Sequence, residues 1–148
     1  MSKLRTQHGD DHPDAAIKHL LDAQALLGQR RADGAAYLSG YVVECALKSL
    51  WLHETGVPPS SSMPWGTSHK LSFLATNVAA LASVAGAKTA RYFSSTTSSV
   101  PSSAIGAWKP EMRYRSPSMS PSDAQSWCNI ADTVYRETVA QMRLDGVL

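Results

Sequence analysis

The chain has 148 residues, a length that suits one domain with a single hydrophobic core. Its hydrophobic fraction of 43% is ordinary for a globular protein and argues against a fibrous or a disordered chain. The formal net charge of +2 is too small to predict nucleic-acid binding by itself.

The N-terminal segment, residues 1–12, is polar and has none of the apolar core of a secretory signal. We therefore expect a flexible N-terminal tail, followed by one helical domain over residues 13–148. The histidines and aspartates within residues 8–12 are metal-ligand types, but no further ligand stands at a suitable spacing. No metal site and no cofactor is predicted.

The stretch 33–56 is apolar or aromatic on every side when it is read at helical spacing, which predicts a central helix that other helices cover. Asp33 is the expected N-cap, and Gly56 is the glycine expected after the last turn. A preceding helix should begin near Pro13 and end around residues 28–31. Because the connection is very short, these two helices should form an antiparallel hairpin.

One face of the central helix carries Tyr37, Tyr41, Glu44, Lys48 and Trp51. The two charges argue against a membrane span, since each costs about 2.5–3.5 kcal/mol at the centre of a bilayer. Two interpretations stay open. Glu44 and Lys48 form an (i, i+4) pair at the surface, or Glu44 is partly buried and meets an arginine from elsewhere in the chain.

After the central helix, residues 57–67 are rich in proline and serine and predict a loop. A third helix should follow, with Ser68 as its cap and Gly86 as its end. Residues 87–93 fit either a short helix or a loop. The Ser/Thr tract 94–103 predicts a low-complexity loop, long enough to suggest a mobile flap or a partner-binding segment.

Residues 107–123 are loop-like but carry large apolar side chains beside arginines, a composition typical of a loop that docks on something. The last helix should run from Pro121 to about Leu144, with Ser120 as its cap. Four helices without alternating strand patterns indicate an all-α fold. We expect an up-down four-helix bundle with a long irregular connection between the third and fourth helices.

Both cysteines, Cys45 and Cys128, lie in apolar helical patterns without metal-ligand neighbours. Two buried free thiols are typical of a reducing compartment, so a cytoplasmic location is expected. The chain has no apolar run of the about 18 uncharged residues that a membrane helix needs, so no membrane association is predicted.

The charges are spread unevenly along the chain. Between Thr55 and Ser122 there are six basic residues and a single acidic one, Glu111. This basic segment fits a partner that is acidic or carries phosphate, and it equally fits a flexible loop region with solubilising lysines. The six basic residues are Lys70, Lys88, Arg91, Lys109, Arg113 and Arg115.

The segment AAYLSGYVVECALKSLWL, residues 35–52, resembles the second helix of HEPN domains. These are small four-helix bundles of prokaryotes, often encoded beside a minimal nucleotidyltransferase. The preceding AQALLGQRRADGA resembles the family's first hairpin, and SHKLSFLA (68–75) resembles the start of its third helix. EMRY (111–114) resembles the Arg-Tyr pair before its last helix. The resemblance covers roughly residues 15–142.

This resemblance implies a homodimer with a cleft at the ends of the second and fourth helices. Many family members are ribonucleases that use an Arg-x4-6-His motif at the start of the last helix. Arg113 and Arg115 stand in the matching region, but no histidine follows His69, so the usual general base is missing. The resemblance also suggests that Glu44 and Arg113 pair across the bundle.

Three functions stay open. The first is a non-catalytic dimeric module, in a bacterial toxin–antitoxin or defence context, that binds a nucleotide, RNA or a nucleotidyltransferase partner. The second is a toxin-type endoribonuclease with a rearranged site, in which Arg113 stabilises the phosphate and the base is His69, or His53 across a dimer. The third is a purely structural, scaffolding dimer.

The candidate binding residues combine cations for phosphate with aromatic side chains for stacking. Packing in the core or in a dimer interface is the alternative role of the aromatic residues. The candidates are Arg113, Tyr114, Arg115, Lys109, Glu44, Lys48, Tyr41, Tyr37 and Trp108.

Overall fold

A computed structural model describes residues 1–58 and 62–148, and within this part of the chain the fold is all-α without a strand. The predicted all-α class is therefore confirmed. The α-helices are α1 (His12–Gly28), α2 (Ala32–Thr55), α3 (Leu71–Ala82), α4 (Ser95–Ser99), α5 (Pro121–Tyr135) and α6 (Gln141–Leu144). Short 3-10 helices are η1 (Lys88–Arg91), η2 (Val100–Ser102), η3 (Ala104–Ala107) and η4 (Pro110–Tyr114), and a π-helix, η5 (Arg136–Ala140), joins α5 to α6.

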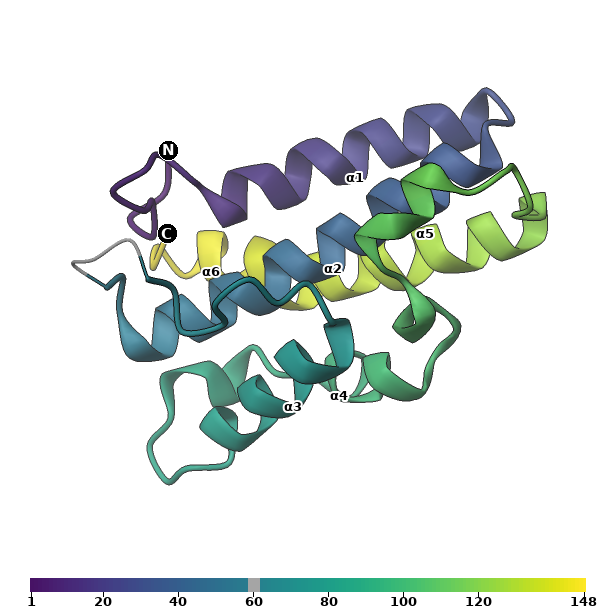
Figure 1. Cartoon of the computed structure of the whole chain (residues 1–148). Coiled ribbons are helices and arrows are strands. Elements are labelled where there is room, and N and C mark those ends of the chain that lie inside the picture. The colour runs from purple at the N-terminus through teal and green to yellow at the C-terminus, as the bar shows by residue number, and fades with distance from the viewer. Residues whose placement is uncertain (59–61) are drawn as a thin grey trace.

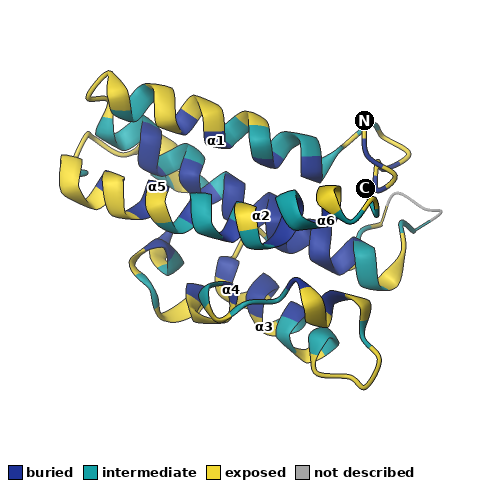
Figure 2. Ribbon diagram, turned by 180° about the vertical axis from the view of Figure 1, so that it is seen from behind, coloured by how far each residue is buried: buried dark blue, intermediate teal, exposed yellow. Residues whose placement is uncertain are grey.

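Helix α2 lies at the centre and packs against α1, α3 and α5 (Figure 1). Its residues are buried without a break from Val42 to Leu52, and half-buried positions before that alternate with buried ones. Figure 2 colours buried residues dark blue, and α2 carries much of this colour. A helix that is apolar on every side gains most when every side is covered, since burial contributes about 25 cal/mol per Å² of apolar surface. The prediction of a central helix in this stretch is confirmed.

The start of α2 differs from the prediction. Arg31 is the N-cap, and no side chain caps this end of the helix. The Asp33 carboxylate instead accepts hydrogen bonds from the backbone N–H groups of Ser118 and Met119, at 2.9 and 3.1 Å, and so fixes the chain that leads into α5. Gly56 follows the last turn with φ of +80°, a left-handed conformation that glycine adopts without strain, as predicted.

Helices α1 and α2 form the expected hairpin, joined by residues 29–31 (Figure 1). Helix α3 is shorter than predicted. It begins after Lys70 and ends at Ala82, and the Ser68 hydroxyl accepts from the Lys70 N–H rather than capping the helix. The loop predicted over 57–67 falls partly on residues 59–61, which lie outside the described residues.

The prediction of a low-complexity loop over 94–103 is wrong, because this tract forms α4 and η2. The Ser94 hydroxyl caps α4 by accepting from the Thr97 N–H at 3.2 Å. The side chains of Thr97, Val100 and Ile105 are fully buried. Serine and threonine hydroxyls satisfy the backbone locally here, so short helical turns form in a sequence of low helix propensity.

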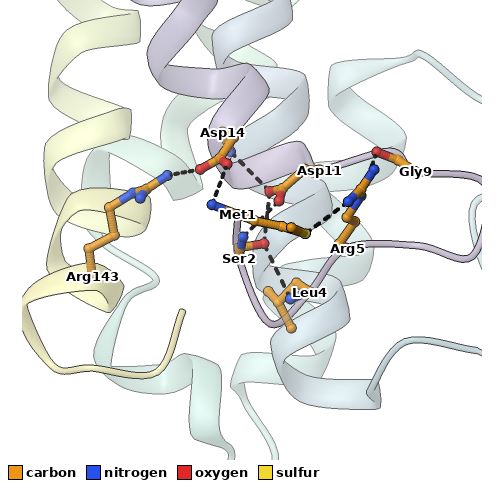
Figure 3. A network of polar contacts seen from close by, with 8 residues as sticks. All are labelled: Met1, Ser2, Leu4, Arg5, Gly9, Asp11, Asp14 and Arg143. Atoms are coloured by element: carbon orange, nitrogen blue, oxygen red, sulfur yellow. Dashed lines mark hydrogen bonds and ion pairs between the residues drawn. The ribbon is translucent and has the colours of Figure 1, made fainter.

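The last helix begins as predicted, with Ser120 accepting from the Asp123 N–H at 3.0 Å and Pro121 in the first turn. It reaches Leu144 through the π-helical segment η5. The N-terminal residues fold back onto this end of the molecule, where Ser2, Leu4 and Thr6 are buried. Figure 3 shows the contacts that hold them: Ser2 donates to Asp11, while the N-terminal ammonium and the Arg143 guanidinium both meet Asp14.

Across the described residues, none of the helices combines the length and the apolar character that crossing a bilayer requires.

Candidate functional site

The Glu44 carboxylate is the most deeply buried charge of the predicted polar face, with the residue 3% exposed. Its Oε1 accepts from Lys48 Nζ at 2.5 Å and lies 2.9 Å from His69 Nδ1, while its Oε2 has no partner within the described residues. Each interpretation of Glu44 from the sequence is correct in one part only: the (i, i+4) pair with Lys48 forms, and Glu44 is buried. The pair with Lys48 is buried rather than at the surface, and His69 takes the place that an arginine was expected to fill.

Lys48 is sealed into the same cluster. Its side chain is 7% exposed, and its ammonium lies 5.1 Å from the centre of the Trp65 ring. Trp65 in turn packs edge-on against His12 and Trp51. Burial and the nearby Lys48 ammonium lower the pKa of His12 to about 4. Lys48 therefore neutralises Glu44 inside the protein and has little surface left for a ligand.

A second cluster surrounds Trp108, which is 2% exposed. Its indole Nε1 donates to the Tyr37 carbonyl at 2.9 Å, and its ring meets Tyr41 edge-on at 4.8 Å. The indole lies directly over Gly40, where a Cβ atom would stand 2.1 Å from the ring. Trp108 is therefore an anchor that packs the segment before η4 onto α2, which leaves no free face for stacking on a ligand.

The two tyrosines beside Trp108 are half-buried, and their hydroxyl groups lie 3.1 Å apart. Burial, followed by the hydrogen bond with Tyr37, raises the pKa of Tyr41. Tyr41 also stacks against His19 of α1 at 5.4 Å between ring centres. These contacts connect the polar face of α2 to α1 on one side and to η4 on the other.

A cleft of about 650 Å³ opens between residues 67–72 and residues 106–111. Lys70, Lys109 and Glu111 are exposed on its walls, and His69 contributes a side chain that is 48% exposed. The N-terminus of α3 also borders this cleft, without a side-chain cap and without an acidic residue in its first turn. Its free N–H groups and the dipole of the helix favour negative charge at this point.

A second, smaller hollow of about 200 Å³ is lined by Met112 and Arg113 of η4. Arg113 and Arg115 are exposed beside it, close to Tyr37 and the first turn of α2. The Arg113 guanidinium stands 4.8 Å from the centre of the Tyr114 ring, and hydrogen bonds to Tyr114 and Tyr37 raise its pKa. The Tyr114 side chain, 76% exposed, is the most accessible of the aromatic candidates.

The two hollows hold four of the six cations of the basic segment, and none of these four has an ion-pair partner in the part of the chain that the structure describes. Within residues 1–58 and 62–148, carboxylate partners within ion-pair distance occur for Arg91, Arg136 and Arg143, as well as for the buried Lys48. Lys70, Lys109, Arg113 and Arg115 have no such partner. The positive charge of the segment is therefore concentrated along η4 and available to a ligand.

Three of the predicted site residues, Glu44, Lys48 and His69, come together, and Arg113 joins Tyr37 and Tyr114 at the second hollow. Reasoning from the sequence missed Trp65 and His12, which seal the Glu44 cluster, and Lys70, which faces the cleft. Lys70 had one signal, its place beside His69 in the basic segment. Within the described residues, no group of three or more His, Cys, Asp or Glu side chains is arranged to hold a metal ion.

Comparisons of this chain with protein-family models, with curated proteins and with solved structures found no match.

Proposed function

We propose that this chain is a HEPN-like module that binds a phosphate-bearing ligand, a nucleotide or a segment of RNA, along η4. One observation carries the proposal. Four cations without ion-pair partners among the described residues line two hollows that both border η4. Exposed cations without an ion-pair partner also occur outside the hollows, Lys18 among them, so the distinguishing feature of these four is that they line hollows in which an external anion can be held.

The shape of the site supports the same ligand class. Small-molecule sites commonly measure about 300–1,000 Å³, and the larger cleft falls within that range. The guanidinium groups of Arg113 and Arg115 suit two-pronged binding of phosphate oxygens, while Lys70 and Lys109 act as point charges. The exposed Tyr114 ring offers a stacking face for a base.

The finer points of the family resemblance are part of this proposal. They comprise the up-down arrangement of four helices, the homodimer, and a nucleotidyltransferase partner in a toxin–antitoxin or defence context. The support for them is the likeness of residues 35–52, 68–75 and 111–114 to HEPN segments. Sedimentation at micromolar concentration tests the dimer directly, since a clean monomer would remove it.

Isothermal titration with AMP and with a short single-stranded RNA at low salt tests the ligand class. The double charge reversals Lys70→Glu/Lys109→Glu and Arg113→Glu/Arg115→Glu should each weaken binding by at least about tenfold, because a hydrogen bond to a charged group is worth about 1.5–3 kcal/mol. Lys18→Glu reverses an exposed lysine outside both hollows and serves as the matched control. Equal loss in all three variants, or no binding by the wild type, would refute the proposal.

A metal-independent ribonuclease is a second candidate, favoured by the contact between Glu44 and His69. A carboxylate that holds one imidazole nitrogen leaves the other available as a general base, next to cations that would stabilise a phosphate. Incubation of total RNA with the wild type and with His69→Gln and Arg113→Ala tests it. Cleavage that both substitutions abolish supports the enzyme, and intact RNA with the wild type eliminates it.

A further inference from the structure

His69 stands where the buried Glu44 cluster meets the open cleft. Its Nδ1 lies 2.9 Å from Glu44 Oε1, the same oxygen that accepts from the Lys48 ammonium at 2.5 Å. The carboxylate side chain is 4% exposed, whereas the imidazole is 48% exposed. One edge of the ring is therefore held inside the protein, and the rest of the ring reaches the cleft wall.

The partner on the inner edge decides where the imidazole carries its proton. A carboxylate paired with an ammonium only accepts hydrogen bonds, so Nδ1 has to be the donor in this contact. A neutral imidazole has a single N–H group. When His69 is neutral, its Nε2 is left without a proton and acts as a hydrogen-bond acceptor.

The direction of Nε2 follows from the same geometry. The two nitrogens lie on different edges of the ring, and the Nδ1 edge faces the interior. His69 also lines the cleft together with Lys70, Lys109 and one carboxylate, Glu111. A lone pair is thus presented beside two cations. The cations attract a phosphate group. The lone pair repels phosphate oxygens but accepts a hydrogen bond from an O–H group.

We propose that His69 Nε2 is a specificity-determining acceptor, which makes the cleft select phosphate esters that carry a hydroxyl donor near the phosphate, as the sugar of a ribonucleotide does. Glu44 is the positioning residue that enforces the acceptor state of Nε2, and Lys48 donates to the same carboxylate oxygen. This inference rests on the proposed function, because it assumes that the cleft binds a phosphate-bearing ligand. The inference adds recognition of a hydroxyl group of the ligand to the recognition of its phosphate by the cations.

Calorimetric titration with AMP and with 2′,3′-dideoxy-AMP, at a pH where ¹⁵N NMR shows a neutral His69 imidazole, tests the selection. The two ligands differ only in the sugar hydroxyl groups. The wild type should bind AMP about fivefold more tightly, the effect of one neutral hydrogen bond. His69→Phe keeps a ring and removes Nε2, so the ratio should fall to about one while the affinity for the dideoxy ligand is held.

The outcomes separate the two proposals. Equal affinity of the wild type for both ligands overturns the role of His69 and leaves phosphate binding intact. Failure of the wild type to bind either ligand overturns the proposed function, and the selection falls with it. AMP lacking only the 2′- or only the 3′-hydroxyl then shows which hydroxyl is read, because the ligand without that group should bind like the dideoxy form.

The tautomer has a direct readout that needs no ligand. Long-range ¹H–¹⁵N correlation NMR of the wild type at about pH 8 should show His69 protonated at Nδ1 and bare at Nε2. The double variant Glu44→Gln/Lys48→Met removes the obligate acceptor without leaving a buried ammonium alone, and it should allow the Nε2–H form to appear. A wild-type His69 that is protonated at Nε2 overturns the inference whatever the binding data show.

Discussion

Lys48 and Lys109 illustrate two uses of the same side chain. Lys48 is buried between Glu44 and Trp65, and its ammonium is paired with the Glu44 carboxylate inside the protein. Lys109 is exposed on the wall of the cleft and has no carboxylate within ion-pair distance in the described part of the chain. The difference teaches that charge in the sequence does not indicate function until burial and pairing are known. Buried, paired charges belong to the fold, and exposed, unpaired ones are the candidates for ligand binding.

Substitution of the two lysines should give the largest contrast. Lys48→Met leaves Glu44 buried with His69 alone, and removal of one partner of a buried ion pair costs about 3–5 kcal/mol of stability. Lys109→Met removes an exposed cation and should change the free energy of unfolding by less than about 0.5 kcal/mol. Urea denaturation monitored by circular dichroism compares them. Similar midpoints for both variants would erase the distinction between the two lysines.

Acidification should destabilise the fold through the buried His12. The pKa of His12 falls from 6.5 to about 4 on folding, because burial and the Lys48 ammonium disfavour its charged form. Between these two pKa values the unfolded chain binds more protons, so stability is lost as the pH drops from about 6.5 towards 4. The loss from His12 reaches at most about 3 kcal/mol.

Urea denaturation at several pH values measures this slope, and His12→Gln should flatten it. The flattening is incomplete, because burial also lowers the pKa values of His19 and His53. His8→Gln replaces an exposed histidine and is the matched control. A slope that is the same in wild type and in His12→Gln would show that His12 is not the group that titrates.

Gly40→Ala tests the anchor that places the cations. The new methyl group would stand 2.1 Å from the Trp108 ring, so the indole and the segment leading to η4 have to move. Overpacking of this kind costs about 1–3 kcal/mol. Gly28→Ala is the control, since nothing lies within 4 Å of a Cβ atom there. Thermal melts of both variants decide the point, and equal melting temperatures would mean that Trp108 does not lie on Gly40.

The smallest effect is expected for an ion pair at the surface. Arg143 meets Asp14 beside the N-terminal segment, with both side chains more than a third exposed (Figure 3). Such pairs contribute about 0–1 kcal/mol, so Arg143→Ala should shift the unfolding midpoint only slightly. A loss as large as that of Lys48→Met would show that pairing, rather than burial, separates the structural charges from the others.

Much of the fold is predictable because it depends on local patterns. The apolar residues of α2 predict its burial, and Ser120 with Pro121 predicts the start of α5. The tract 94–103 is harder, since its low helix propensity hides hydroxyl groups that cap their own turns and side chains that reach the core. Local composition does not reveal such tertiary contacts.

The site was predictable only in part, for the same physical reason. Spacing along one helix puts Glu44 and Lys48 on the same face, and the structure agrees. The third member, His69, comes from a different segment, and Arg113 was the expected partner instead. Which side chain reaches a buried carboxylate depends on how the loop before α3 packs. Trp65 anchors that loop, but the sequence around it has no helical or strand spacing from which its burial could be predicted.

Mapping of AMP binding by NMR chemical-shift perturbation tests the central claim most directly. The amide and side-chain signals of residues 67–72 and of residues 106–117 should shift together as AMP is added, while those of Lys18 and of the buried Lys48 stay nearly constant. Shifts confined to other surfaces, or a spectrum that AMP leaves unchanged, would contradict the assignment of the unpaired cations to a phosphate-bearing ligand.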